Sequence, residues 1–395
     1  MLAPADFHSL AEQFQADAVT IRRHLHAHPE LSFEEHETAM FIAKTLKNWD
    51  IPHQTGVSGT GIVVLLKGKN PDSRTVALRA DMDALPILEK NNVPYKSQND
   101  GVMHACGHDV HTTCLLTALR ILNASRDRWS GTVKALFQPG EEKLPGGASL
   151  MIAEGVLDNP RPEAILGQHV HPPLRAGVVG FREGMYMAST DEVYITVHGR
   201  GGHGALPNTT IDPVAISAQL ITALQQLVSR QADPGTPSVL SFGKIYSDGG
   251  ATNVIPNTVH LEGTFRTHDE NWRNVALRHV QHMAESVCRG MGADCTVRIV
   301  SGYPALHNHE TLTRKARTAA ETYLGRENVV ELPIRMTGED FAYYSRQIPA
   351  CFYRLGTGNP ERGVTSPVHS DTFDIDEAAL ITGGGLMAWL AVMTE

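Results

Sequence analysis

The sequence predicts an α/β protein with a mixed, mostly parallel sheet, helices on both faces, and an inserted two-layer α+β domain. Short apolar runs alternate with segments of helical spacing in the first third of the chain, which is typical of a parallel sheet covered on both faces. From about residue 187 the order becomes β-α-β-β-α-β, as in small two-layer units. The length of 395 residues also exceeds that of one ordinary domain.

The elements of the first domain follow from its apolar runs. Residues 61–68, 75–80, 131–138 and 163–169 are expected strands, because each is a short apolar run. Residues 112–125 carry apolar side chains at helical spacing and predict a helix. Later segments predict a helix at 148–157, a strand at 351–356 and a closing helix at 377–393.

The inserted domain has its own regular pattern. A strand of alternating polarity precedes a helix that opens with Asp212 as N-cap and Pro213 in the first turn. Strands at 238–247, 258–267 and 294–301 and a helix at 270–290 complete the expected unit. We therefore predict an inserted domain at 187–301 and a discontinuous first domain at 1–186 and 302–395.

Composition excludes several classes of partner. The formal charge of −9 and the absence of basic runs argue against nucleic acid as a partner. No apolar stretch is long enough to span a bilayer, and the N-terminus lacks a signal-peptide pattern. Five scattered cysteines in such a chain are expected to be reduced. The predicted location is cytoplasmic, without a membrane partner.

Acids and an imidazole follow the ends of three predicted strands. Asp81 and Asp83 come after one strand, Glu141 and Glu142 after another, and His169 ends a third. Ligands of open α/β sheets bind outside the carboxyl ends of the strands. We therefore expect these side chains to share one site.

The stretch VMHACGHDVH, residues 102–111, adds a thiol and three imidazoles before the helix predicted at 112–125. Cys106 and His108 are two positions apart, so they converge on one atom only where the backbone is irregular, as the intervening glycine allows. A metal site and ordinary core residues both remain open from this pattern alone.

The adjacent Glu141 and Glu142 favour a metal. Two carboxylates at the end of a buried strand are costly to bury without a cation, although a solvated loop is the plain alternative. Neighbouring side chains point apart, so one can ligate an ion while the other addresses a water molecule. That division of labour suits hydrolysis at a metal centre.

Ordered motifs along the whole chain carry a family resemblance: RADMDALP, HACGHDVH, FQPGEE, GQHVHP, GRGGHGALP, GGATNVIP, GTFR, GEDFAYY and VHSDTFDID. The chain resembles the aminoacylase/carboxypeptidase group of metallopeptidases. It is most similar to the amidohydrolase branch with hippurate hydrolase, N-acyl-L-amino acid amidohydrolase and the indole-3-acetyl-amino acid hydrolases. The resemblance implies a di-metal exopeptidase-like catalytic domain, an inserted lid and dimerisation domain, and a homodimer or higher homo-oligomer.

The resemblance also implies a role for each site residue. Two divalent ions, Mn, Zn, Co or Ni, would be held by Cys106, His108, Glu142, His169 and His369, with the thiolate bridging them. Glu141 would be the general base and acid, and Asp83 would orient the site. His203 would polarise the scissile carbonyl, in this family usually in the partner subunit's active site, and Asn253 and Arg266 would contact substrate.

The implied reaction is metal-dependent hydrolysis of an N-acyl amino acid, a small-molecule substrate, by an activated water. A dipeptidase or an N-acetyl-diaminopimelate deacetylase would use the same motifs. A thiol hydrolase with Cys106 as nucleophile and His108 as base, and a non-catalytic binding protein, are rivals from other classes. The chain departs from commoner family residues at Gly140, Lys143 and Asn208.

Overall fold

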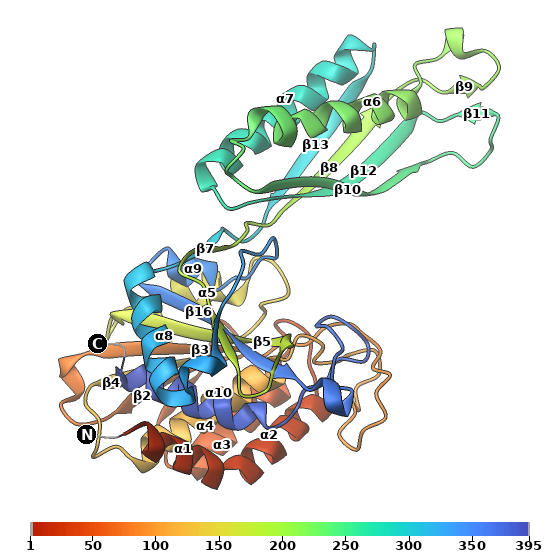
Figure 1. Ribbon diagram of the computed structural model, residues 1–395. Coiled ribbons are helices and arrows are strands. Elements are labelled where there is room, and N and C mark those ends of the chain that lie inside the picture. Colours follow the sequence, from red (N-terminus) through yellow and green to blue (C-terminus); the bar gives the residue numbers. More distant parts are fainter. Residues whose placement is uncertain (1–2, 394–395) are drawn as a thin grey trace. The chain divides into compact units, whose positions relative to one another are not determined.

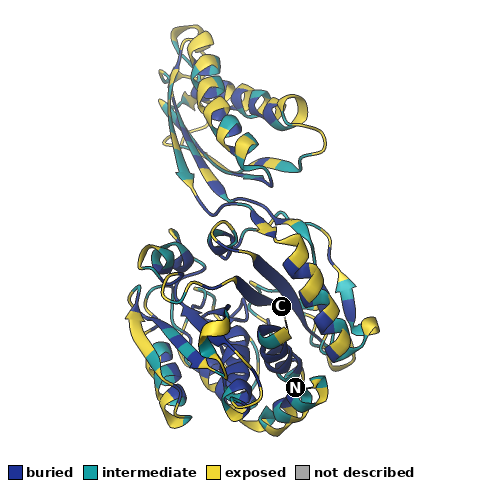
Figure 2. Ribbon diagram, turned by 90° about the vertical axis from the view of Figure 1, so that its left-hand side faces the viewer, coloured by how far each residue is buried: buried dark blue, intermediate teal, exposed yellow. Residues whose placement is uncertain are grey.

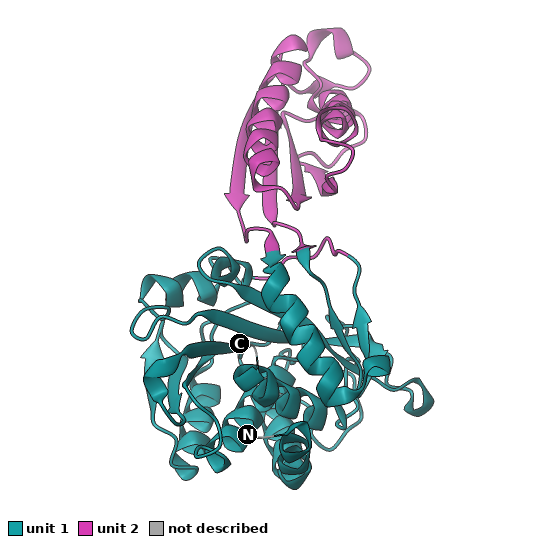
Figure 3. Ribbon diagram, turned by 60° about the vertical axis from the view of Figure 1, so that its left-hand side comes forward, with its two compact units in different colours: residues 1–184, 307–333, 340–395 teal, residues 185–306, 334–339 magenta. Residues whose placement is uncertain are grey.

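The computed structural model describes residues 3–393 and divides them into two compact units (Figures 1 and 3). Unit 1 contains residues up to 184, residues 307–333, and residues from 340 onward. Unit 2 contains residues 185–306 and 334–339. The sequence-based division placed residues 334–339 in the first domain, whereas in the structure they belong to unit 2. They do so because the backbone N–H of Arg335 donates to the carbonyl of Tyr186 at 2.9 Å.

Unit 1 is built on a mixed sheet of eight strands. Its central strands, β3, β4, β5 and β16, pair in parallel, whereas β1 and β2 join one edge in antiparallel fashion. The predicted mixed, mostly parallel sheet is therefore confirmed. In sheet order the strands are β1 (His53–Val57), β2 (Gly61–Lys67), β4 (Thr132–Gln138), β3 (Thr75–Asp81), β5 (Ala164–Arg175), β16 (Ala350–Gly358), β6 (Val179–Phe181) and β15 (Val329–Glu331).

Helices cover both faces of this sheet (Figure 1). One face carries most of them, packed around the buried helices α4 and α10 in a single apolar core (Figure 2). The other face carries the short helices α5 and α9, where the Tyr344 hydroxyl contacts the Met151 sulfur. The helices are α1 (Pro4–Gln13), α2 (Gln15–Ala27), α3 (His36–Asn48), α4 (His108–Ala124), α5 (Gly147–Ala153), α8 (Glu310–Leu324), α9 (Ala342–Ser345) and α10 (Ala379–Met393).

Unit 2 has the predicted β-α-β-β-α-β order. Its antiparallel sheet buries alternate residues of β8, including Val193, Ile195 and Val197, against the helices α6 and α7. The Asp212 carboxylate accepts the Val214 N–H at 2.8 Å, so the predicted N-cap is confirmed. The elements are β8 (Asp191–His198), α6 (Pro213–Gln226), β10 (Ser238–Ser247), β12 (Thr258–Thr267), α7 (Glu270–Gly290) and β13 (Asp294–Ser301), with a small ladder of β9 (Gly202–His203) and β11 (Val254–Ile255).

Three element ends differ from the sequence-based expectation by four residues or more. Helix α4 begins at His108, four residues before the predicted 112. Helix α5 ends at Ala153, before Gly155, whose φ of +78° is left-handed. Strand β5 continues to Arg175, past the predicted end at 169. Short strands β7 (Gly184–Met187) and β14 (Leu306–Asn308) fall where the chain passes between the units.

Candidate metal centre

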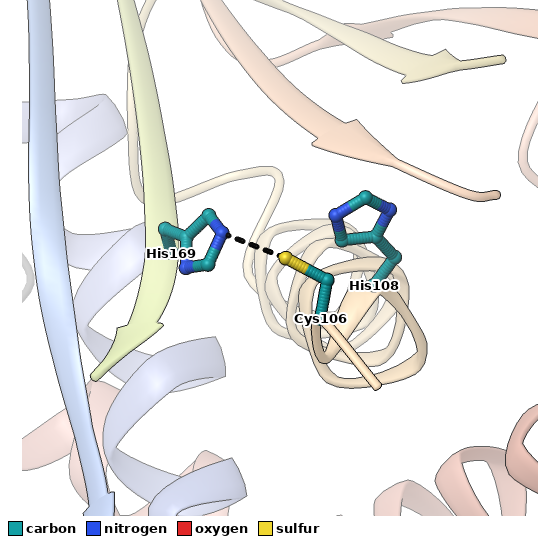
Figure 4. A group of neighbouring side chains, drawn as sticks. All are labelled: Cys106, His108 and His169. Atoms are coloured by element: carbon teal, nitrogen blue, oxygen red, sulfur yellow. Dashed lines mark hydrogen bonds between the residues drawn. The ribbon is translucent and has the colours of Figure 1, made fainter. Parts of the chain in front are cut away.

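The start of α4 brings a thiol and two imidazoles together. Gly107 has a φ of +79° and is the N-cap of α4, so Cys106 precedes the helix and His108 is its first residue. A Cβ at position 107 would lie 2.7 Å from the Val170 side chain, which leaves room only for glycine. The Cys106 Sγ lies 3.4 Å from the Nε2 atom of His169 on β5 (Figure 4). The irregular backbone expected between Cys106 and His108 is therefore present.

Five predicted ligands form two triads that share Cys106. In each triad the potential ligand atoms lie within 4.8 Å of one another. One triad is Cys106, His108 and His169, and the other is Cys106, Glu142 and His369. A thiolate common to both triads could serve two ions at once.

His369 reaches this site from a strained turn. Its φ of +63° lies in the left-handed region, which is uncommon for a residue with a side chain. Its backbone N–H donates to the Ala105 carbonyl at 2.8 Å, which holds the turn beside Cys106. The His369 Nε2 atom lies 3.3 Å from the Cys106 Sγ and 3.3 Å from the Glu142 Oε1.

Asp83 contacts two of the residues that the resemblance implies as ligands, His108 and Glu142. Its Oδ1 is 3.1 Å from the His108 Nδ1, so that nitrogen carries a proton and Nε2 faces the triad. Its Oδ2 accepts the Glu142 N–H at 2.9 Å and the Ser32 hydroxyl at 2.7 Å. One buried carboxylate therefore contacts an expected ligand from α4 and another from the loop after β4.

The donor set fits divalent cations. The His108 Nε2 and the Glu142 Oε1 are buried and make no hydrogen bond to any of the described residues, although polar atoms in such places normally have a partner. Burial opposes the charged form of His108, yet the carboxylates of Asp81 and Asp83 raise its pKa to about 10, so the site stabilises positive charge. Thiolate, imidazole and carboxylate together suit zinc, cobalt, nickel and manganese.

The same surroundings disfavour Cys106 as a free nucleophile. Burial, reinforced by the carboxylates of Glu142 and Glu141, holds the pKa of the thiol well above its usual value. A catalytic cysteine needs the opposite shift, toward the thiolate. The base that a thiol hydrolase would need, His108, is already protonated at neutral pH, because against the effect of burial Asp81 and Asp83 raise its pKa to about 10.

Glu141 lies beside the ligands and is itself largely buried, with 7% of its surface exposed. Its carboxylate falls within 4.8 Å of the ligand atoms of His108 and Glu142. Its Oε1 also accepts the Asp340 backbone N–H at 3.3 Å. The side chain is thus held next to the site, where a carboxylate can exchange a proton with a reacting group.

A buried ion-pair network behind the site was not foreseen. Arg79 donates to Asp81 at 2.5 Å and to Asp340 at 2.7 Å. Asp81 in turn bonds the His111 Nδ1, and the His111 Nε2 accepts the Val170 N–H at 2.9 Å. His111 therefore has no nitrogen left for a metal. The sequence signal for this network was Arg79, a charged residue inside the apolar run 75–80.

The three predicted substrate residues lie in unit 2. The His203 Nδ1 accepts the Ala205 N–H at 3.0 Å, so its proton is on Nε2, which can donate. The Asn253 carbonyl accepts the Gly204 N–H at 2.7 Å, which places Asn253 beside His203 in the β9–β11 ladder. Arg266 lies on β12, outside that ladder.

Comparison with known proteins identifies the family. Residues 77–391 match the model of peptidase family M20/M25/M40. The chain belongs to this family. Membership makes it a metal-dependent hydrolase of amide bonds, and the predicted resemblance is confirmed. Among the described residues, no helix has both the length and the hydropathy of a membrane span.

Three relatives each match three quarters of this M20 chain or more. N-acetyl-L-cysteine deacetylase of Bacillus subtilis is 40% identical, covering 96% of this chain and 87% of its own. N-acyl-L-amino acid amidohydrolase of Geobacillus stearothermophilus is 42% identical over 76% of this chain and 80% of its own. The solved Bacillus subtilis YXEP protein, a dinuclear metal-binding M20 peptidase, is 34% identical with a TM-score of 0.81, covering 96% and 98% of the two chains.

His104 gives a pH-dependent prediction for this M20 site. The residue is 1% exposed, and burial lowers its pKa to about 4. Between pH 6.5 and 4 the unfolded chain therefore binds a proton that the folded chain does not, so acidification should lower the free energy of unfolding. His104→Leu should make this dependence shallower by up to about 1.4 kcal/mol per pH unit.

Denaturant unfolding of the metal-loaded protein at pH 7, 6 and 5 measures this slope. Leu122→Ala, a substitution of a fully buried residue without a titrating group, controls for general destabilisation. Equal slopes for the wild type and His104→Leu would contradict the assignment.

Proposed function

We propose that the amide bond cleaved by this hydrolase is that of an N-acyl amino acid, yielding a carboxylic acid and a free amino acid. The observation that carries the proposal is the pair of ligand triads sharing Cys106, with Glu141 directly beside them. Two similar curated proteins, N-acetyl-L-cysteine deacetylase and N-acyl-L-amino acid amidohydrolase, have names that specify N-acyl amino acids and support the same substrate class.

The proposed ligands are Cys106, His108, Glu142, His169 and His369. Bound there, two divalent ions would act as Lewis acids that lower the pKa of water and polarise a carbonyl group. His169 is suited to ligation, because burial holds its pKa well below the usual value and its Nδ1 donates to the Val170 carbonyl. The neutral ring then presents its Nε2 lone pair toward Cys106.

Glu141 is the proposed proton carrier. Its carboxylate takes a proton from the attacking water and returns it to the leaving nitrogen, so one residue serves both halves of the reaction. Asp83 fixes two of the proposed ligands near Glu141, because it bonds the His108 ring and the Glu142 N–H. Held in this way, the base needs no rearrangement during the reaction.

Arg266 is the proposed partner of the substrate carboxylate. Its Nη1 atom is buried and has no hydrogen-bond partner among the described residues. Burial lowers the pKa of this guanidinium, although nearby Asp191 favours its charge. A guanidinium with an unpaired buried Nη1 atom suits binding of a carboxylate.

His203 would donate from Nε2 to the scissile carbonyl oxygen, and Asn253 would make a further substrate contact. Unit 2 would serve as lid and dimerisation domain of a homodimer. A panel of acetyl, benzoyl and longer-acyl amino acids and dipeptides, assayed with Mn, Zn, Co or Ni restored to the apoprotein, tests substrate and metal. Preference for dipeptides would favour the dipeptidase alternative, and activity indifferent to chelators would favour a thiol hydrolase.

Glu141→Gln should lower kcat by about 10²–10⁴-fold, because general acid–base catalysis contributes that much. The bound metal should stay, since Glu141 is not one of the five proposed ligands. Steady-state kinetics and elemental analysis on the same preparation measure both quantities. Glu163→Gln, at an exposed position, is the control, and undiminished turnover of Glu141→Gln would refute the role.

Arg266→Met should lower kcat/KM for N-acyl amino acids by about 10–100-fold, because a hydrogen bond to a charged group contributes about 1.5–3 kcal/mol. Acyl amides that lack the free carboxylate should be hydrolysed by variant and wild type at similar rates. Comparing kcat/KM for the two substrate types isolates the carboxylate contact. Equal losses on both types would show that Arg266 supports the fold rather than binding the carboxylate.

A further inference from the structure

A buried carboxylate outside the proposed mechanism holds the backbone next to Glu141. Glu35 has no exposed surface. Its Oε1 accepts the N–H of Gly140 at 2.8 Å and that of Phe33 at 2.9 Å, and its Oε2 accepts the Thr60 hydroxyl at 2.7 Å. Gly140 directly precedes Glu141, so Glu35 is one peptide unit from the proposed base.

A second buried carboxylate holds the other side of Glu141. The Asp83 Oδ2 accepts the Glu142 N–H at 2.9 Å and the Ser32 hydroxyl at 2.7 Å. The backbone is therefore fixed immediately before and immediately after Glu141. We call this pair of contacts the Glu35–Asp83 clamp.

The conformation of Gly140 explains why a clamp is needed. Its φ of +58° is left-handed, and a Cβ at this position would lie 2.3 Å from the Phe33 ring. Glycine is thus required there, but it is also the residue with the widest backbone freedom. Without a restraint, the direction of the Glu141 side chain would vary with the backbone conformation of Gly140.

We propose that Glu35 is a positioning residue that fixes Glu141 in its reactive orientation through the Gly140 N–H. The inference rests on the proposed role of Glu141. A misplacement of about 1 Å costs on the order of 10²-fold in rate, so a restraint one residue from the base matters for turnover. Burial raises the pKa of Glu35, which shows that the fold bears a desolvation cost to keep a carboxylate there.

Glu35→Ala removes the acceptor and should lower kcat by about tenfold or more, while KM stays within about threefold and the metal content is unchanged. Glu35→Gln keeps one oxygen for the Gly140 N–H and can donate to the Thr60 hydroxyl, so it should restore kcat to within about threefold of wild type. Steady-state kinetics on acetyl amino acids, elemental analysis and thermal melting of the same preparations give these values.

Leu66→Ala, at a fully buried position of strand β2 outside the Glu35–Asp83 clamp, is the control for loss of stability. A kcat of Glu35→Ala equal to that of this control would overturn the inference. So would a joint loss of kcat and metal, which would assign Glu35 to the metal site. If Glu35→Ala does not fold, Thr60→Val replaces it, because it removes the hydroxyl that bonds the Glu35 Oε2. This variant should lower kcat and leave KM and the metal content unchanged. An unchanged kcat would overturn the inference.

Glu141→Gln separates this inference from the function on which it rests. Full activity of Glu141→Gln would overturn the role of the base and the clamp together. An inactive Glu141→Gln with a fully active Glu35→Ala would overturn the clamp alone.

Discussion

The Asp83 carboxylate is the contact on which the rest of the site depends. One oxygen fixes the ring of His108, and the other fixes the backbone of Glu142. These two residues belong to different ligand triads and to different segments, α4 and the loop after β4. A single side chain just after β3 therefore contacts both triads, in the way that carboxylates behind metal ligands do in general.

Charge balance explains why so many acids can lie in one buried place. Asp81, Asp83 and Glu35 are all fully or almost fully buried, and each accepts several hydrogen bonds. Arg79 offsets part of the negative charge. The remaining negative charge faces the two triads, where the buried His108 Nε2 and Glu142 Oε1 atoms lack hydrogen-bond partners among the described residues. Divalent cations would complete this balance, because buried charges require partners.

The sequence predicted the elements whose pattern is local. Apolar runs located the strands β2, β3 and β4, and Asp212 marked the start of α6. The start of α4 was placed too late because its first turn is buried but polar, from His108 to His111, so hydrophobic periodicity gave no signal there. The proposed ligands were recognised by their position after strands and by ordered motifs.

The supporting contacts could not be predicted in the same way. Glu35 bonds a backbone N–H 105 positions further along the chain, and Arg79 bonds Asp340 across 261 positions. The Gly140 N–H is not marked by residue type, because a backbone N–H is present at almost every position. No sequence spacing connects Arg79 with Asp340.

The most direct test of this account is the metal content of the reconstituted protein and of Cys106→Ala. Cys106 is common to both triads, so the wild type should hold two divalent ions per chain and Cys106→Ala should lose tight binding of both. Elemental analysis after dialysis, with anomalous diffraction to locate the ions, gives the answer. A wild type that retains one ion or none, or a Cys106→Ala protein that retains two, would contradict the account.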